Sequence, residues 1–161
     1  MTPRRPAGEA LRYKRSRFAT RLPKHYRYTR AHYWLHRESD DGPWRIGLTT
    51  FATRMLGDLV ECNFALAAGD PVRVGQPIGT IEGFKAISDL YAVAEGRFAG
   101  ANGALDMDIT LVESAPYADG WLYAVDGAAD PDSLDVEGYV SVLDATIDRM
   151  LAARGEGDPD A

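Results

Sequence analysis

The sequence predicts a mainly β protein, a small barrel or sandwich, with one short internal helix and an amphipathic helix near the C-terminus. From Tyr33 onward, short β-prone segments alternate with turn residues, which is typical of barrels and sandwiches rather than βαβ folds. In residues 136–151 the apolar residues instead recur at helical spacing. A length of 161 residues, 45% of them apolar, fits one domain with one core.

A β-hairpin and a short helix are expected first. Residues 33–37 are β-prone, residues 40–43 (Asp-Asp-Gly-Pro) favour a turn, and apolar residues alternate with Arg45 and Gly47 in residues 44–48. The hydroxyls of Thr49 and Thr50 can cap a helix that runs through residue 56, and Gly57 can end it.

Further strands are expected in the middle of the chain. Residues 59–64 form a candidate strand, a turn at residues 68–71 follows, and Val72 and Val74 alternate with Arg73. Residues 78–82 and 90–94 are two more candidate strands, on either side of a polar, glycine-containing tip.

The C-terminal region differs from the rest because its pattern is helical. The expected helix begins near Ser133 or Asp135 and ends at Gly155, with an acidic tail over residues 154–161. Its apolar positions share i, i+3, i+4 and i+7 spacing: Val136, Tyr139, Val140, Leu143, Ile147, Met150 and Leu151.

Charge divides the chain into a basic start and an acidic body. The formal net charge is −6, yet residues 1–31 contain ten basic residues and one acid, which leaves a net −15 for the rest. A body this acidic argues against nucleic-acid binding, which depends on cations that neutralise phosphates. Residues 1–21 are expected to form a flexible basic extension that touches an anionic partner or folds back on the body. An anion-binding interaction module that uses this extension is therefore one functional hypothesis.

The single cysteine excludes an intramolecular disulfide and a Cys-based zinc site, and it favours a reducing compartment. No apolar run approaches the ~20 residues of a membrane-spanning helix, and no signal-peptide pattern follows the charged start. A cytoplasmic location is expected. A mitochondrial one would require the basic start to be a transit peptide, and Pro3 and Pro6 interrupt the helix that such a peptide forms.

No catalytic or metal-binding constellation is visible in the sequence. His32 and His36 would share one face of a strand, but no third ligand accompanies them. Cys62 lies in an apolar strand and is expected to be an inert core thiol. The phosphate-binding loops and the Gly-x-Ser-x-Gly motif are absent, so no self-contained active site is visible.

Lys85 is unusual by count alone, because it is the only lysine after residue 31. Other cationic positions of the body hold arginine, which is always protonated and does not form ordinary amides, whereas a lysine amine can be acylated. The position of Lys85 between two candidate strands therefore indicates a modification site at a hairpin tip.

Several ordered blocks resemble the glycine cleavage system H-protein family. The blocks cover residues 22 to about 150 and include Gly47-Leu48-Thr49, Leu56-Gly57-Asp58-Leu59-Val60 and Gly120-Trp121-Leu122. The central block, Glu82-Gly83-Phe84-Lys85-Ala86-Ile87-Ser88-Asp89, resembles the family's lipoyl-attachment hairpin. Phe84 and Ala86 also distinguish it from the Met-Lys-Met tip of biotinyl domains.

The resemblance implies a lipoyl-domain-like barrel-sandwich hybrid over residues 22–153 that carries lipoate covalently on Lys85. It implies a non-catalytic carrier that moves an aminomethyl intermediate and reducing equivalents. The implied partners are a lipoate ligase or lipoyl transferase, glycine decarboxylase, aminomethyltransferase and dihydrolipoyl dehydrogenase. The residues expected to support the tip are Glu82, Gly83, Phe84, Ala86, Ser88 and Asp89.

Some positions depart from the family pattern. Tyr33 and Phe51 stand where the family has a Glu and a His beside the carried group, and Gly83 replaces a Ser. Ile109 and Glu113 replace a Pro and an Asn. With these departures, the chain is similar to the lipoate-binding proteins that serve heterodisulfide-reductase-like complexes. A carrier of sulfur intermediates in sulfur oxidation is therefore an alternative function.

Overall fold

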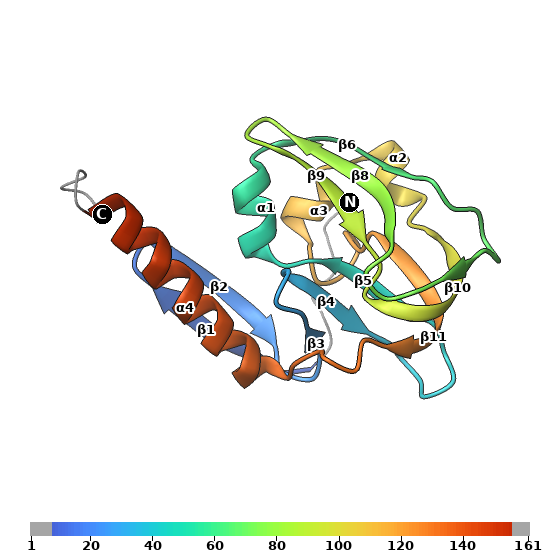
Figure 1. Ribbon diagram of the computed structural model, residues 1–161, viewed down its shortest axis with the longest axis horizontal. Coiled ribbons are helices and arrows are strands. Elements are labelled where there is room, and N and C mark those ends of the chain that lie inside the picture. The colour runs from blue at the N-terminus through green and yellow to red at the C-terminus, as the bar shows by residue number, and fades with distance from the viewer. Residues whose placement is uncertain (1–7, 156–161) are drawn as a thin grey trace.

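The computed structural model describes residues 8–155 of the chain (Figure 1). It contains four helices and eleven strands within this range. In chain order they are β1 (Ala10–Arg15), β2 (Phe18–Pro23), β3 (Arg27–Tyr28), β4 (Tyr33–His36), β5 (Trp44–Leu48), α1 (Thr50–Leu56), β6 (Leu59–Phe64), β7 (Pro71–Val72), β8 (Pro77–Gly83), β9 (Ile87–Tyr91), β10 (Ala94–Ala101), α2 (Ala104–Met107), α3 (Leu111–Ser114), β11 (Tyr123–Ala129) and α4 (Val136–Gly155).

Two antiparallel sheets enclose the main apolar core. The six-stranded sheet has the order β3-β4-β5-β11-β10-β7, and the three-stranded sheet has the order β6-β8-β9. Leu35 and Ile46 of the first sheet and Ile78, Ile81 and Leu90 of the second are at most 1% exposed and belong to one cluster. The expectation of a mainly β protein with one short internal and one C-terminal helix is confirmed for these elements, and the structure adds two further one-turn helices.

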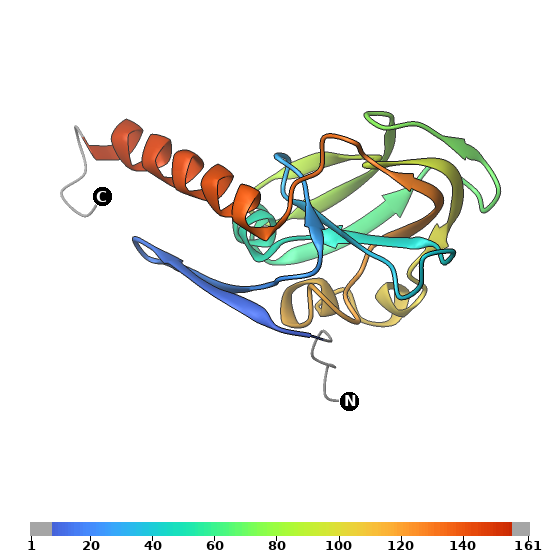
Figure 2. The ribbon, with the colours of Figure 1, turned by 90° about the horizontal axis from the view of Figure 1, so that it is seen from below.

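A second apolar cluster joins this body to α4 and to the β1–β2 hairpin. Tyr28 and Tyr139 stack with their ring centroids 4.8 Å apart, and both are fully buried. Figures 1 and 2 show the hairpin running alongside α4, beside the barrel. The cluster is largely aromatic: Tyr13, Leu22, Tyr26, Tyr28, Trp34, Phe51, Tyr117, Val136, Tyr139, Leu143 and Ile147.

Of the expected flexible extension over residues 1–21, the part that the structure describes is a hairpin folded back on the body, which is the second of the two arrangements expected from its charge. Residues 10–23 pair as a regular hairpin, with Tyr13 opposite Thr20 and Arg15 opposite Phe18. Leu11 and Tyr13 alternate with the exposed Arg12 and Lys14, so one face of β1 is buried. The many charged residues make this short alternation difficult to recognise in the sequence. Tyr13 becomes buried, and Leu11 partly buried, only because α4 packs against them. Residues 1–7 lie outside the described residues.

The elements predicted in the first half are confirmed. Strands β4 and β5 pair with Tyr33 opposite Leu48. Thr49 caps α1, since its side chain accepts a hydrogen bond from the backbone N–H of Ala52 at 3.5 Å. Gly57 ends α1 with φ of 76°, a conformation that glycine adopts without strain. The C-terminal helix is also confirmed as α4, and residues 156–161 of the expected acidic tail lie outside the described residues.

Other boundaries differ from the prediction. The candidate strand at residues 90–94 is divided, because β9 ends at Tyr91 and β10 begins at Ala94. β7 is limited to Pro71 and Val72. His32 precedes β4 with φ of 72°, so the expectation that His32 and His36 share a strand face is wrong. His32 instead lies 2.8 Å from the hydroxyl of Tyr139, and the ring of His36 stacks on Tyr26.

Residues 8–155 contain neither a membrane-spanning helix nor a cluster of metal-binding side chains. No helix between residues 8 and 155 has the length and apolar character needed to cross a membrane. Over the same residues, no three His, Cys, Asp or Glu side chains gather as a metal site would require.

Candidate functional site

Lys85 lies at the tip of the hairpin formed by β8 and β9. The strands pair up to Glu82 opposite Ile87, and the backbone N–H of Gly83 donates to the carbonyl of Ala86 at 2.9 Å, which closes the turn. Phe84, Lys85 and Ala86, which we call the tip, are therefore the residues that leave the sheet. All three side chains are exposed, and Phe84 is 80% exposed. The predicted placement of Lys85 between two strands is confirmed.

The backbone of the tip is fixed against the turn between α1 and β6. The N–H of Phe84 donates to the carbonyl of Asp58, and the N–H of Lys85 donates to the carbonyl of Leu56, each at 2.9 Å. A Cβ atom on Gly83 would lie 2.2 Å from the Leu56 carbonyl oxygen, so only glycine allows this approach. The Lys85 backbone is thus held rigidly by residues that precede it by almost thirty positions.

The amine of Lys85 remains accessible. Its Cγ passes over Gly57, where a Cβ would lie 2.8 Å away, so this second glycine gives the side chain a path out of the turn. Among residues 8–155, no hydrogen bond or ion pair holds Lys85 Nζ. A rigid backbone that presents an unpaired primary amine is suited to acylation by another protein.

A cleft of about 480 Å³ opens beside the tip, between α1 and α3. Its walls include Thr50, Thr53, Arg54, Asp58 and Glu113, and Phe84 and Lys85 form one edge. Glu113 replaces the family's usual Asn, so the lining contains two carboxylates and the Arg54 guanidinium.

The remaining predicted residues lie along the same hairpin. Ser88 donates from its hydroxyl to the carbonyl of Asp89 at 2.9 Å, and Asp89 accepts a long 3.5 Å hydrogen bond from the Tyr91 hydroxyl. Both Ser88 and Asp89 are exposed, whereas Glu82 is half-buried beside the tip. The structure brings Glu82, Gly83, Phe84, Ala86, Ser88 and Asp89 together around Lys85, as one continuous hairpin.

The two aromatic departures are part of the packing rather than of a polar groove. Tyr33 is buried, and its hydroxyl accepts a hydrogen bond from the Tyr91 N–H at 3.0 Å. Burial raises the pKa of Tyr33 to about 12, so this phenol carries no charge at neutral pH. Phe51 packs edge-on against Phe18 and lies 4.6 Å from the ring of His32. Neither position offers a charge to a carried group.

Two other side chains with reactive groups, Cys62 and His32, have pKa values that burial shifts. Burial raises the pKa of the Cys62 thiol to about 12, which leaves it protonated and unreactive. Burial lowers the pKa of His32 to about 4, so this imidazole is neutral at pH 7.

The α1–β6 turn holds the tip through contacts that the sequence does not predict. Leu56 and Asp58 supply the carbonyl oxygens that hold the tip, and Gly57 and Gly83 provide the close approach. Every residue has a backbone carbonyl, so the sequence does not show which carbonyls accept these hydrogen bonds. Only the two glycines could have indicated this contact.

Comparisons with known proteins agree with the geometry. A sequence profile described as "Glycine cleavage H-protein" matches residues 26–140. A glycine cleavage system H protein from Mycobacteroides abscessus is 36% identical over 139 residues, which are 86% of this chain and 97% of that protein. One from Listeria monocytogenes is 37% identical over 126 residues, which cover 76% and 98% of the two chains. The crystal structure of a glycine cleavage system H protein from Mycobacterium marinum matches with a TM-score of 0.67 and 34% identity, covering 74% of this chain and 97% of that one.

Proposed function

Because this chain belongs to the glycine cleavage H-protein family, we propose that Lys85 is the residue that bears its lipoate. Members of this family are non-catalytic lipoyl carriers with covalently attached lipoate, and the protein is a carrier of the glycine cleavage system rather than an enzyme. The assignment to Lys85 depends mainly on one observation: an exposed amine without a partner in residues 8–155, on a backbone held by two hydrogen bonds.

The residues of the tip fit an acyl-lysine. Formation of an amide removes the positive charge of the amine, and the surroundings of Lys85 tolerate this because no described residue is paired with it. The neighbouring Phe84 and Ile87 are 80% and 69% exposed, which gives the tip an apolar surface. An isolated exposed apolar pair on a hairpin tip is suited to contact with other proteins.

Lipoate attached there would supply a disulfide ring that accepts two electrons, and a thiol that can hold a one-carbon amine group. The protein determines where the lipoyl group is attached and how it is presented. The β8–β9 hairpin holds the point of attachment clear of the barrel, and tethering raises the effective concentration of a carried group to the mM range. The rigid Lys85 backbone limits the motion to the side chain, so each partner meets the same starting geometry.

The partners follow from these roles. A lipoate ligase or lipoyl transferase would modify Lys85, and glycine decarboxylase, aminomethyltransferase and dihydrolipoyl dehydrogenase would use the arm in turn. The bacterial origin of the relatives supports a cytoplasmic site for this work.

Two other hypotheses receive less support. None of the relatives named above is described as a sulfur-oxidation protein, so the comparisons add nothing to that alternative. The anion-binding module would act through the basic extension, but the part of it that forms β1 and β2 is packed against α4.

The attachment site is tested by mass spectrometry of intact protein. The purified chain is incubated with lipoate ligase, lipoate and ATP, together with the variants Lys14→Arg, Lys24→Arg and Lys85→Arg. These three positions are all the lysines of the chain. We expect wild type and the first two variants to gain one lipoyl group, and Lys85→Arg to gain none. Modification of Lys85→Arg, or an unmodified wild type, would overturn the assignment.

The pathway is tested with lipoylated protein and glycine decarboxylase. A carrier of the glycine cleavage system supports exchange of labelled bicarbonate into glycine. Exchange at the background rate by fully lipoylated wild type would reject this pathway and leave the attachment site standing.

A further inference from the structure

A second cleft borders Lys85, and most of it is built by segments outside the residues that match the family. The profile covers residues 26–140, whereas the β1–β2 hairpin and the second half of α4 lie before and after that range. The lining of this cleft includes Lys85, three residues of α1, and residues from the hairpin and α4. We call it the hairpin–α4 cleft.

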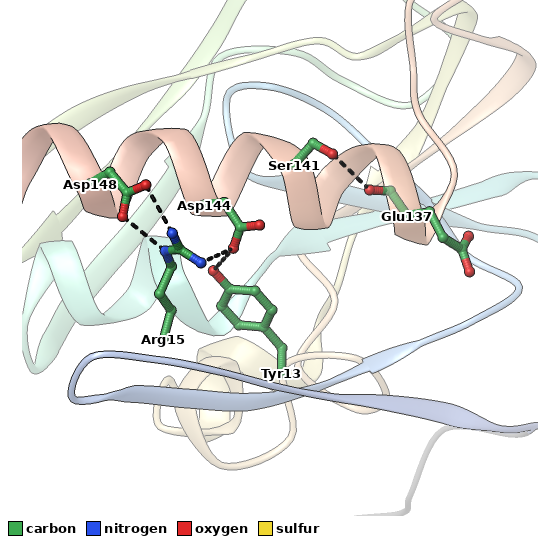
Figure 3. Close-up of polar contacts among 6 residues, drawn as sticks. All are labelled: Tyr13, Arg15, Glu137, Ser141, Asp144 and Asp148. Atoms are coloured by element: carbon green, nitrogen blue, oxygen red, sulfur yellow. Dashed lines mark hydrogen bonds and ion pairs between the residues drawn. The ribbon is translucent and has the colours of Figure 1, made fainter.

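Polar contacts fix the hairpin against α4 (Figure 3). The Tyr13 hydroxyl donates to Asp144 Oδ1 at 2.7 Å. Arg15 donates from two nitrogens to the two carboxylate oxygens of Asp148, at 2.8 and 2.9 Å, and also lies 3.3 Å from Asp144. A bidentate arginine–carboxylate pair fixes orientation as well as distance. The loop after Arg15 is thereby held beside α1 and α4.

The floor of the cleft is apolar. The cleft has a volume of about 270 Å³, close to the lower end of the range for small-molecule sites. Phe18 and Phe51 meet edge-on with centroids 5.5 Å apart, and the Arg54 guanidinium lies 5.7 Å from the Phe18 ring centroid. The apolar lining consists of Phe18, Phe51, Met55, Ile147, Met150 and Leu151.

The rim of the cleft is cationic. Arg15, Arg17, Arg54 and Arg154 line it with Lys85, and none of the described residues lining it is an Asp or Glu. Asp144 and Asp148 do not line the cleft, but both pair with Arg15 and offset its charge. Arg17 and Arg54 lie outside this cluster. The chain as a whole has a net charge of −6, so a group of cations is unusual in it. Acylation of Lys85 would remove one cation of the rim and leave Arg17 and Arg54 beside the paired Arg15.

We propose that the hairpin–α4 cleft is a resting site for the lipoyl arm on Lys85, and that it takes the arm when the sulfur end is anionic. The proposal rests on the attachment proposed above. Because Lys85 is at the edge of the cleft, the arm enters without crossing the protein surface. The methylene chain fits the apolar floor, and a thiolate is stabilised beside arginines.

The same charges oppose a cationic load. A protonated amine on the arm would meet arginines and no carboxylate in this cleft, and like charges repel at short range. The α1–α3 cleft, which also borders Lys85, is lined by Asp58 and Glu113 together with Arg54. Of the two clefts, only this one therefore offers carboxylates to a cationic load.

Methionine methyl groups provide a direct test of where the arm lies. The chain has four methionines, of which Met55 and Met150 line the hairpin–α4 cleft. Met107 is 89% exposed, lines neither cleft and serves as an internal control. In protein labelled with 13C-methyl methionine, reduction of the lipoylated form at pH 9 should shift the Met55 and Met150 signals and leave Met107 unchanged. Unchanged Met55 and Met150 signals in protein of confirmed lipoyl mass would overturn the resting site alone.

The preference for an anionic end is tested by thiol reactivity. The reduced, lipoylated protein is alkylated with iodoacetamide across pH 6–10, in a Cys62→Ala background that removes the only other thiol. The variant Arg17→Gln/Arg54→Gln removes two cations of the rim, and Arg12→Gln/Arg73→Gln removes two exposed arginines outside the cleft. We expect the apparent pKa of the dihydrolipoyl thiols to rise by about 0.5 unit or more in the first variant only. Equal pH profiles in all three proteins would overturn the charge preference.

Failure of the proposed function would look different. A protein that ligase does not modify gives no lipoyl mass, so neither measurement can begin. A protein that is modified but shows neither effect retains its carrier role and loses only the resting site.

Discussion

At the scale of single residues, two glycines decide where the reactive amine lies. Gly83 faces the Leu56 carbonyl, and Gly57 lies beneath the Lys85 side chain. At position 83 the close neighbour is backbone, since a Cβ there would lie 2.2 Å from the Leu56 carbonyl oxygen. At position 57 the close neighbour is the Lys85 side chain, whose Cγ would lie 2.8 Å from a Cβ. Position 83 departs from the family's usual serine, and in this structure no side chain fits there.

Replacement of Gly83 by alanine tests this contact. A new Cβ must displace backbone rather than a flexible side chain, so we expect Gly83→Ala to lower the free energy of unfolding by about 1–3 kcal/mol. Urea denaturation measures the change. Gly103→Ala is the matched control, since nothing lies within 4 Å of a Cβ there and φ is −62°. A control variant as unstable as Gly83→Ala would contradict the steric explanation.

At the scale of elements, the β1–β2 hairpin depends on α4. A two-stranded hairpin is marginal alone in water, and α4 covers its apolar face with Tyr139, Leu143 and Ile147. Burial, together with the Asp144 carboxylate, raises the pKa of Tyr13, so its hydroxyl remains a donor to Asp144. Hairpin and helix therefore stabilise each other across more than 130 residues of sequence.

Removal of the Tyr13 hydroxyl should loosen the hairpin without unfolding the barrel. A side-chain hydrogen bond of this kind contributes about 1 kcal/mol, so Tyr13→Phe should speed amide hydrogen exchange in β1 and β2 about fivefold. Exchange in β8 and β9 should stay the same. Tyr91→Phe, whose hydroxyl makes only a 3.5 Å contact with Asp89, is the control. Equal acceleration in both hairpins would show that the whole fold had been destabilised.

At the scale of the whole molecule, one polar cluster joins the barrel to α4. The Tyr139 hydroxyl lies 2.8 Å from both His32 Nδ1 and Thr49 Oγ1. His32 precedes β4, Thr49 caps α1 and Tyr139 belongs to α4, so three elements meet at one hydroxyl. Burial lowers the pKa of His32 from 6.5 to about 4, which makes the stability of this junction depend on pH.

His32 therefore binds a proton less readily in the folded state than in the unfolded chain. Between pH 6.5 and about 4 the unfolded state binds more protons at His32, so the stability falls as the pH falls through this window. The full shift corresponds to about 3 kcal/mol. His32→Asn removes the titration and suits the positive φ of 72°.

Urea unfolding at pH 7.5 and 4.5 measures this effect. We expect wild type to lose more stability between these two pH values than His32→Asn does. Carboxylates such as Asp148, which pairs with Arg15, are present in both proteins and contribute equally to both losses. The difference between the two losses therefore isolates His32. Identical losses would contradict the assignment of a neutral, buried imidazole.

Much of the site could be predicted from local sequence. The hairpin and the α1 cap at Thr49 follow from period-two patterning and turn residues, and the choice of Lys85 follows from its being the only lysine after residue 31 and from the family resemblance of its block. The Leu56 and Asp58 carbonyls could not be predicted, because a backbone acceptor looks the same in every residue. The paired role of His32 and Tyr139 was also missed, since 107 residues separate them.

The sequence by itself singled out Lys85 as the candidate for acylation and determined that the body is mainly β, because amine chemistry and strand periodicity are local properties. Only the tertiary structure decided what surrounds that residue. The N-terminal segment was expected to be a flexible basic arm on the strength of its charge, yet residues 10–23 are a hairpin held by Asp144 and Asp148. The physical reason is that burial depends on distant surfaces, and no local pattern says which surface will cover a short apolar face.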